Sequence, residues 1–228
     1  FFLCQEGSFV QWDGVKWIQA PPKHGIDLNR NFPVHWVPFQ MFGMDAGAYA
    51  LSEPESRAVV DAVHRRERIA VGLTNHTYTG CILSQPYQKN SLLKKPDLNL
   101  MYRLAEASVQ ETEYRVLKVY PDFTYDKTNP IIGVWADCLS VTFGIPAYTL
   151  ELWNPYQWAG VEVEKPAEFF ANPDPKIIDA LLEKAASSNF HSWEKFEHPQ
   201  LGEVEIGGIE YLRTIRNPPV ELLQKECQ

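Results

Sequence analysis

The sequence has 228 residues, of which 45% are hydrophobic, so it can bury a large core as one domain, or at most two. Its formal net charge of −8 argues against nucleic-acid binding, which needs a basic surface. No apolar run is long enough to span a membrane.

The first long element is predicted in the segment ALSEPESRAVVDAVHRRE, residues 50–67, which has the pattern of an amphipathic helix. Ser52 and Glu55 have the spacing of a capping box, and Pro54 falls in the first turn, where proline is tolerated. The predicted apolar face consists of Ala58, Val59, Ala62 and Val63.

Further strands and helices alternate along the chain. We predict strands at 68–76 and 145–152, helices at 98–113 and 175–188, and a loop at 121–135. This alternation predicts an α/β fold with a mixed, largely parallel central sheet flanked by helices. In such sheets ligands bind at the carboxyl ends of the strands.

Polar residues occur where these strands end. They are the Asp27, Asn29 and Arg30 group, His76, and Glu151. A structural histidine, a salt-bridged glutamate and a buried ion pair are the simplest separate explanations. A shared active site explains all three groups together, and we favour it because α/β enzymes place their chemistry at such positions.

Three motifs carry a resemblance to a known family. The stretches GIDLNRNFP, NHTYTG and YTLELW, in this order, resemble motifs of the zinc carboxypeptidase family, carboxypeptidase A class. The helix sequence SEPESRAVVDAV is also similar to bacterial-type members. The resemblance covers roughly residues 25–155 and implies the carboxypeptidase fold, one zinc ion and a peptide substrate with a free C-terminal carboxylate.

The resemblance also implies roles for individual residues. Asn29 and Arg30 would bind the substrate carboxylate, for which a guanidinium offers matched, charge-assisted hydrogen bonds. His76 corresponds to the family's last zinc ligand. Glu151 corresponds to the catalytic glutamate, which takes a proton from zinc-bound water and passes it to the leaving amine.

Three further positions follow from the same resemblance. Asp27 corresponds to a carboxylate that hydrogen-bonds a zinc-ligand histidine. Asp137, in GVWADC, corresponds to a residue that lines the pocket for the terminal side chain. Tyr125, with Tyr120 as the other candidate, would cap the substrate from the loop before Asp137.

The sequence departs from the family pattern in two ways. The family's first two zinc ligands form an H-x-x-E motif upstream of the N-R-N-F motif, and residues 1–23 contain no histidine. HRRE at 64–67 and HSWE at 191–194 lie downstream, and we interpret both as chance matches on the surface. The arginine that polarises the substrate carbonyl is also missing, and Lys16 and Lys23 are the available cations.

We therefore expect the remaining zinc ligands upstream of Phe1, because the sequence starts without a methionine or signal peptide. Residues 1–195 would be the C-terminal portion of the catalytic domain, and residues 196–228 an extension of uncertain role. The favoured function is a metallocarboxypeptidase. The alternative is an inactive, carboxylate-binding relative, and a deacylase on the same fold is less favoured. Zinc content of the full-length protein distinguishes the first two.

Overall fold

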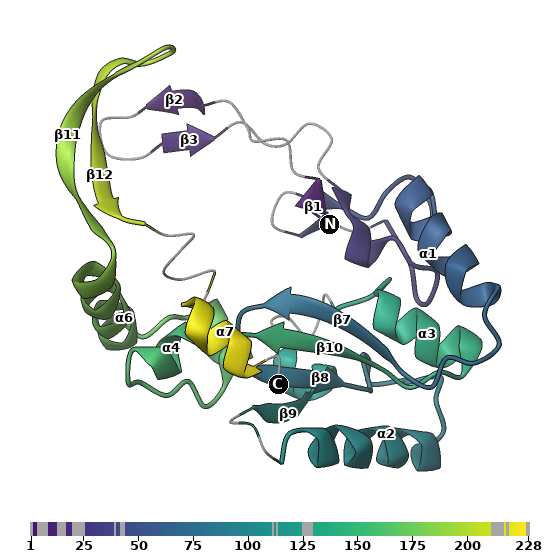
Figure 1. Cartoon of the computed structure of the whole chain (residues 1–228). Helices are drawn as coiled ribbons and strands as arrows, with labels where there is room; N and C mark the ends of the chain where they lie inside the picture. Colours follow the sequence, from purple (N-terminus) through teal and green to yellow (C-terminus); the bar gives the residue numbers. More distant parts are fainter. Residues whose placement is uncertain are drawn as a thin grey trace. The chain divides into compact units, whose positions relative to one another are not determined.

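A computed structural model describes most of the chain (Figure 1). The described residues are 2–3, 9–12, 17–19, 26–38, 40–41, 44–110, 112, 114–124, 130–210, 217 and 219–226. The chain divides into two compact units, residues 1–74, 85–101 and 129–148 in the first and 75–84, 102–128 and 149–228 in the second. Within the described ranges, no helix is long and apolar enough to cross a membrane.

Short elements make up the start of the first unit. They are β1 (Phe2–Leu3), β2 (Phe9–Trp12), β3 (Trp17–Gln19), β4 (Ile26–Asp27), the 3-10 helix η1 (Leu28–Arg30), β5 (Gln40–Met41) and β6 (Met44–Asp45). One sheet has the order β1-β4-β6-β5, and β2 pairs with β3. The parallel pairing of β4 with β6 places the N-R-N-F motif immediately after a paired strand.

The main sheet has the strand order β7-β10-β8-β9. Its strands are β7 (Gly72–Thr77), β8 (Cys81–Ser84), β9 (Arg115–Lys118) and β10 (Ala147–Leu152). Strand β8 runs parallel to β9 and antiparallel to β10. The Gly72 N–H donates to the carbonyl of Pro146 at 2.9 Å, so β7 and β10 begin side by side, and their arrows point the same way in Figure 1. The sheet is therefore mixed and largely parallel, as predicted.

Helices pack on this sheet. A Cβ at Gly72 would lie 2.5 Å from Leu139 and 2.6 Å from Trp135, so glycine lets α3 (Trp135–Phe143) approach the start of β7 closely. The Tyr148 hydroxyl donates to the carbonyl of Met101 at 2.9 Å, which joins β10 to α2 (Lys95–Ser108). These contacts confirm the predicted α/β arrangement of a sheet flanked by helices.

Helix α1 (Pro54–His64) confirms the predicted element but not all of its details. Its N-cap residue is Glu53, without a side-chain cap hydrogen bond, so the predicted capping box is wrong. Ser52 Oγ instead contacts Glu53 Oε1 at 2.6 Å. The buried residues of α1 are Ser56 and Val63. Of the predicted apolar face, Val63 is therefore confirmed as buried, whereas Val59 is 39% exposed and Ala58 is also exposed.

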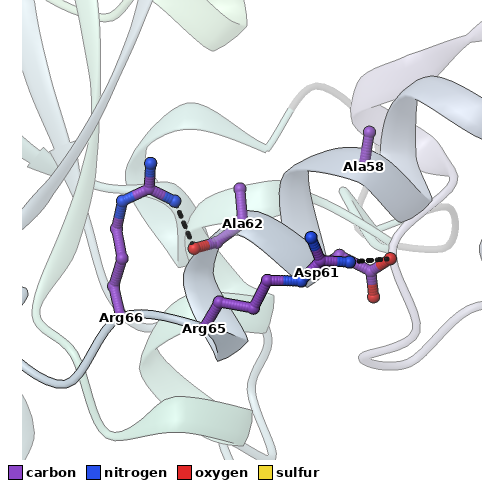
Figure 2. A pocket seen from close by; sticks show the side chains of 5 residues that line it. All are labelled: Ala58, Asp61, Ala62, Arg65 and Arg66. Atoms are coloured by element: carbon purple, nitrogen blue, oxygen red, sulfur yellow. Dashed lines mark hydrogen bonds and ion pairs between the residues drawn. The ribbon is translucent and has the colours of Figure 1, made fainter.

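The outer side of α1 borders a surface hollow of about 680 Å³ (Figure 2). Its lining residues are Ala58, Asp61, Ala62, Arg65 and Arg66. Arg65 Nη2 lies 3.7 Å from Asp61 Oδ2, and Arg66 Nη1 donates to the Ala62 carbonyl at 2.6 Å. The HRRE stretch thus belongs to an exposed, charged helix end, which agrees with our interpretation of it as a chance match.

The second unit contains the remaining elements. They are the π-helical turn η2 (Val119–Phe123), α4 (Pro155–Trp158), α5 (Pro166–Ala171), α6 (Pro175–Ser188), β11 (Phe190–His198), β12 (Gly202–Ile209) and α7 (Val220–Glu226). Tyr156, Val163, Phe169 and Leu181 form a buried cluster under these helices. The boundary predicted between residues 195 and 196 falls within β11, and the two-part division stays a prediction.

Candidate functional site

The turn after β4 fixes the Asp27 and Arg30 side chains. Asp27 Oδ1 accepts a hydrogen bond from the Asn29 N–H at 2.9 Å and so caps η1. Arg30 Nη1 donates to the Asn29 carbonyl at 2.8 Å and lies 3.8 Å from Asp27 Oδ2. The two side chains are only 13% and 18% exposed. Arg30 therefore has an acidic neighbour in the chain, but at a distance too long for a hydrogen bond.

One nitrogen of Arg30 stands out. Its Nε is buried and makes no hydrogen bond with any described residue. A buried donor without a partner is costly, and an arginine of this kind usually marks a site that binds an anion or stores strain. The guanidinium is thus held in place by Asn29 while part of its hydrogen-bonding capacity is left for another group.

Asn29 connects this turn to helix α3. Its Oδ1 accepts a hydrogen bond from the N–H of Trp135, the first residue of α3, at 2.9 Å. Backbone bonds of 2.9 Å from Phe32 N to Gly133 O and 3.1 Å from Gly133 N to Val34 O join the same two segments. The N-R-N-F motif and the GVWADC stretch, far apart in sequence, are therefore tied together in the first unit.

Asp137 lies in the first turn of α3 and is only 3% exposed. Its Oδ1 accepts a hydrogen bond of 2.8 Å from Nε2 of Gln85, which is itself buried, and Gln85 Oε1 accepts one from the Tyr87 N–H. Burial raises the pKa of Asp137, while the Gln85 hydrogen bond and the charge of His35 partly offset this increase. Asp137 is a buried acid within a polar network, and its role in a substrate pocket stays a prediction.

The raised pKa of Asp137 predicts a pH-dependent stability difference. The folded state holds the proton more tightly than the unfolded state, whose ordinary value is 3.8. The contribution of Asp137 to stability is therefore fully present below that value and is lost as the pH rises through the folded pKa. We expect Asp137→Asn to gain stability relative to wild type from pH 4 to pH 7, measured by urea unfolding. A pH-independent difference would contradict this expectation.

His76 and Glu151 lie on the neighbouring strands β7 and β10. The Gly72–Pro146 hydrogen bond sets Gly72 level with Ala147. An unbroken ladder from this hydrogen bond would set His76 level with Glu151, with both side chains on the same face of the sheet. His76 is half-buried, and Glu151 is 8% exposed. An imidazole and a carboxylate therefore lie near the ends of two neighbouring strands.

The same row of side chains continues across the sheet. Glu151 lies opposite Cys81 of β8, and Cys81 lies opposite Arg115 of β9. Burial, followed by the carboxylate of Glu151, raises the pKa of the Cys81 thiol, whereas Arg115 lowers it. Arg115 donates to the carbonyls of Glu164 and Val163 at 2.9 and 3.0 Å. Cys81 is thus a neutral neighbour of Glu151, which sequence reasoning did not assign.

The structure describes only some of the remaining predicted residues. Tyr125 lies outside the described residues, and Tyr120 is half-buried in η2. His191, in HSWE, is exposed on β11 and lies 3.3 Å from Glu210. Among the residues that the structure describes, no group of three or more His, Cys, Asp and Glu side chains could hold a metal ion.

The candidate residues fall into two groups. Asp27, Asn29, Arg30 and Asp137 belong to the first unit, and His76 and Glu151 belong to the second. Within each unit the structure brings residues together that are distant in sequence. The convergence of the two groups in one cleft stays a prediction.

Comparisons with known proteins agree with the motifs. A family model described as zinc carboxypeptidase matches residues 10–185, while a comparison with curated proteins found no match. Carboxypeptidase A from Helicoverpa armigera is 20% identical, with a TM-score of 0.45 over 72% of this chain and 43% of that chain.

Two solved structures of thrombin-activatable fibrinolysis inhibitor are also similar. One is 23% identical, with a TM-score of 0.47 over 72% of this chain and 43% of that chain. The other, the bovine protein in complex with tick carboxypeptidase inhibitor, is 22% identical, with a TM-score of 0.45 over 72% and 55%. The chain thus spans 43% to 55% of the length of these structures.

Proposed function

Because the chain belongs to the zinc carboxypeptidase family, whose model matches residues 10–185, we propose that it is part of a metallocarboxypeptidase. The enzyme removes one residue from the C-terminus of a peptide. The observation that supports this proposal is the adjacency of β7, which carries His76, and β10, which carries Glu151, because a preferred zinc ligand and a candidate general base then lie on neighbouring strands.

The residues present fit zinc only in part. A neutral imidazole such as His76 is a preferred zinc ligand, but the described residues contain no complete set of ligands. The other ligands therefore come from outside these residues in this proposal. Zinc, when bound, activates a water molecule and polarises the scissile carbonyl.

Glu151 is the general base and acid in this proposal. Its carboxylate takes the proton of the attacking water and delivers it to the departing amine. Glu151 is 8% exposed, and its cross-strand neighbour in β8, Cys81, has a thiol whose pKa is raised by burial and therefore stays neutral.

Arg30 and Asn29 bind the substrate's terminal carboxylate. The buried Nε of Arg30 supports this role, because it has no described partner and a carboxylate accepts two parallel hydrogen bonds from a guanidinium. Asp27 keeps the turn in place by capping η1, and its role beside a zinc-ligand histidine is part of the proposal. Asp137 lines the pocket for the terminal side chain, and Tyr125 covers the substrate.

Arg30→Ala tests the carboxylate site. Wild type should prefer a peptide with a free C-terminus over its C-terminal amide, and the variant should lose this preference. Loss of one partner of a buried charge pair costs about 2–5 kcal/mol of binding free energy. The affinities of both peptides are measured for wild type and for Arg30→Ala, each as the natural full-length protein. The melting temperature of each form is measured without ligand.

Two variants serve as controls for Arg30→Ala. Arg103→Ala removes an exposed arginine from α2 and should change neither measurement. Asp27→Asn retains the oxygen that caps η1 but loses the charge near Arg30, so it should keep the preference for the free acid. The proposal is wrong if wild type does not distinguish acid from amide and Arg30→Ala melts far below it, because Arg30 would then be a structural ion-pair residue.

An inactive, carboxylate-binding protein is the second candidate function. It is favoured by one observation, namely that the described residues supply only His76 of the expected ligands. Stoichiometric zinc in the full-length protein supports the metallocarboxypeptidase, whereas carboxylate binding by Arg30 without zinc supports the second candidate.

A further inference from the structure

Strands β11 and β12 form a hairpin, residues 190–209, that lies beyond the residues matched by the family model. Within the described chain it is a two-stranded sheet. Eight of the nine β11 residues are exposed, including Phe190 at 53%, Trp193 at 61% and Phe196 at 44%. A two-stranded hairpin is marginally stable by itself in water, so a neighbour that adds strands would stabilise it.

The two faces of the hairpin differ in character. Residues directly opposite in an antiparallel pair share a face, and the register pairs Phe196 with Val204 and Glu194 with Ile206. One face therefore carries an apolar centre of Phe196, Val204 and Ile206, with Glu194 and His198 on either side of Phe196. This centre is incompletely covered, since Ile206 is 42% exposed.

The other face carries charges that are not balanced within the hairpin. Lys195 lies opposite Glu205, and Glu197 lies directly opposite Glu203. Like charges in this position repel. Lys195 Nζ contacts Glu203 Oε1 at 2.9 Å. Lys195 is thus one cation on a face that carries three carboxylates, those of Glu197, Glu203 and Glu205. A positive charge beside Glu197, on the outer edge of β11, would relieve the repulsion.

We propose that this edge of β11 pairs with β11 of a second copy of the chain, antiparallel and centred on Phe196. In this register Lys195 lies opposite Glu197 of the second copy, and Glu197 lies opposite its Lys195. The repelling Glu197–Glu203 pair of each hairpin thus gains Lys195 of the other copy as a neighbour. The two Phe196 side chains lie opposite each other, so the apolar centres of the two hairpins adjoin on one face of a four-stranded sheet.

The outer residues of the same register also match. Glu194 lies opposite His198 of the second copy. The Gln200 N–H donates to His198 Nδ1 at 3.1 Å, which leaves the ring proton on Nε2, where it can be donated to a carboxylate. Exposed strand edges commonly carry charges that prevent pairing, but these charges attract. Pairing of β12 with β12 of a second copy is disfavoured, because Glu203 and Glu205 would lie close to the same two glutamates of that copy and repel them.

Charge exchange at two positions tests the dimer by analytical ultracentrifugation of the natural full-length protein. Wild type should show a monomer–dimer equilibrium. Lys195→Glu alone and Glu197→Lys alone each create two repulsive pairs, so each should raise the dissociation constant at least about tenfold. A mixture of the two variants restores both attractive pairs and should form heterodimers, and the double variant should dimerise like wild type.

Glu203→Gln is the matched control, because it removes the contact of Lys195 within the hairpin but leaves the pairs between copies. It should dimerise at least as strongly as wild type. The proposal is wrong if wild type stays monomeric at every concentration, which would leave the hairpin edge to a different partner. It is also wrong if a wild-type dimer persists unchanged in both single variants. Neither result bears on peptidase activity, so this test is independent of the proposed function.

Discussion

Replacing Glu151 with glutamine should lower kcat by about 10²–10⁴-fold, the usual contribution of general acid–base catalysis. The amide has nearly the same shape but cannot accept the proton of the attacking water. The substrate carboxylate is bound elsewhere in our proposal, so affinity for the peptide should change little. The measurement is the steady-state hydrolysis of a short peptide by the natural full-length protein, with zinc content determined for both forms.

Glu162→Gln is the control, because it makes the same chemical change at an exposed position of the same unit. It should retain wild-type kcat. Equal zinc content in wild type and Glu151→Gln would assign the loss to the base rather than to the metal site. Turnover by Glu151→Gln at the wild-type rate, with zinc bound, would remove Glu151 from the mechanism.

Elements with clear end signals could be predicted from the sequence. Helix α6 begins and ends at the predicted residues, 175 and 188, because Asp174 and Pro175 mark its start and its apolar residues recur at helical spacing. Strand β10 was predicted at 145–152 and spans Ala147–Leu152. In both cases a local pattern and clear end signals point to the same structure.

Strand β8 and helix α3 were not predicted from the sequence. All four residues of β8 are buried, so its sequence shows no alternation between apolar and polar positions. Helix α3 has five consecutive buried residues, 136–140, and lies directly after the segment predicted to be a loop. On α1, the pattern located the helix but only part of its buried face, since small alanines do not determine which side packs inward.

The candidate site shows a similar division. The motifs identified Arg30, His76 and Glu151, because each is a charged or metal-binding residue beside an apolar strand. The partners of the predicted residues were missed. Gln85, which donates to Asp137, and Cys81, which lies opposite Glu151, carry no signal in one sequence, because their importance depends on pairings between distant segments.

Asn31 is the clearest example of a missed residue. Its side chain is fully buried, and its Nδ2 lies 2.7 Å from the Ala46 carbonyl, 3.1 Å from the Tyr49 carbonyl and 3.0 Å from Ser52 Oγ. Its Oδ1 accepts a hydrogen bond from the Glu53 N–H at 3.2 Å. One amide thus joins the N-R-N-F turn to the segment that leads into α1.

Asn31→Ala should therefore lower the free energy of unfolding by about 3–5 kcal/mol. The Glu53 N–H would lose its partner, which costs about 1–3 kcal/mol for a buried group, and each other hydrogen bond of the amide contributes about 0.5–1.5 kcal/mol. The Tyr49 and Ala46 carbonyls lose the amide but still accept from the Ser52 N–H and Trp36 Nε1. Such a loss is large for a single substitution, and disruption of a buried hydrogen-bond network is among its known causes. Urea unfolding of wild type and variant measures the difference.

Two further variants test whether the loss of stability comes from the hydrogen bonds of Asn31 rather than from the cavity that alanine leaves. Asn31→Asp fills the same space and can still accept from the Glu53 N–H, but it cannot donate to the two carbonyls and adds a negative charge near the Glu53 carboxylate. It should also be strongly destabilised, which a cavity alone would not explain. Asn90→Ala, at an exposed position, should change stability by less than about 0.5 kcal/mol. If Asn31→Ala unfolds at the wild-type urea concentration, the amide does not hold this turn, and the position of Arg30 must depend on the contacts of Asn29 with α3.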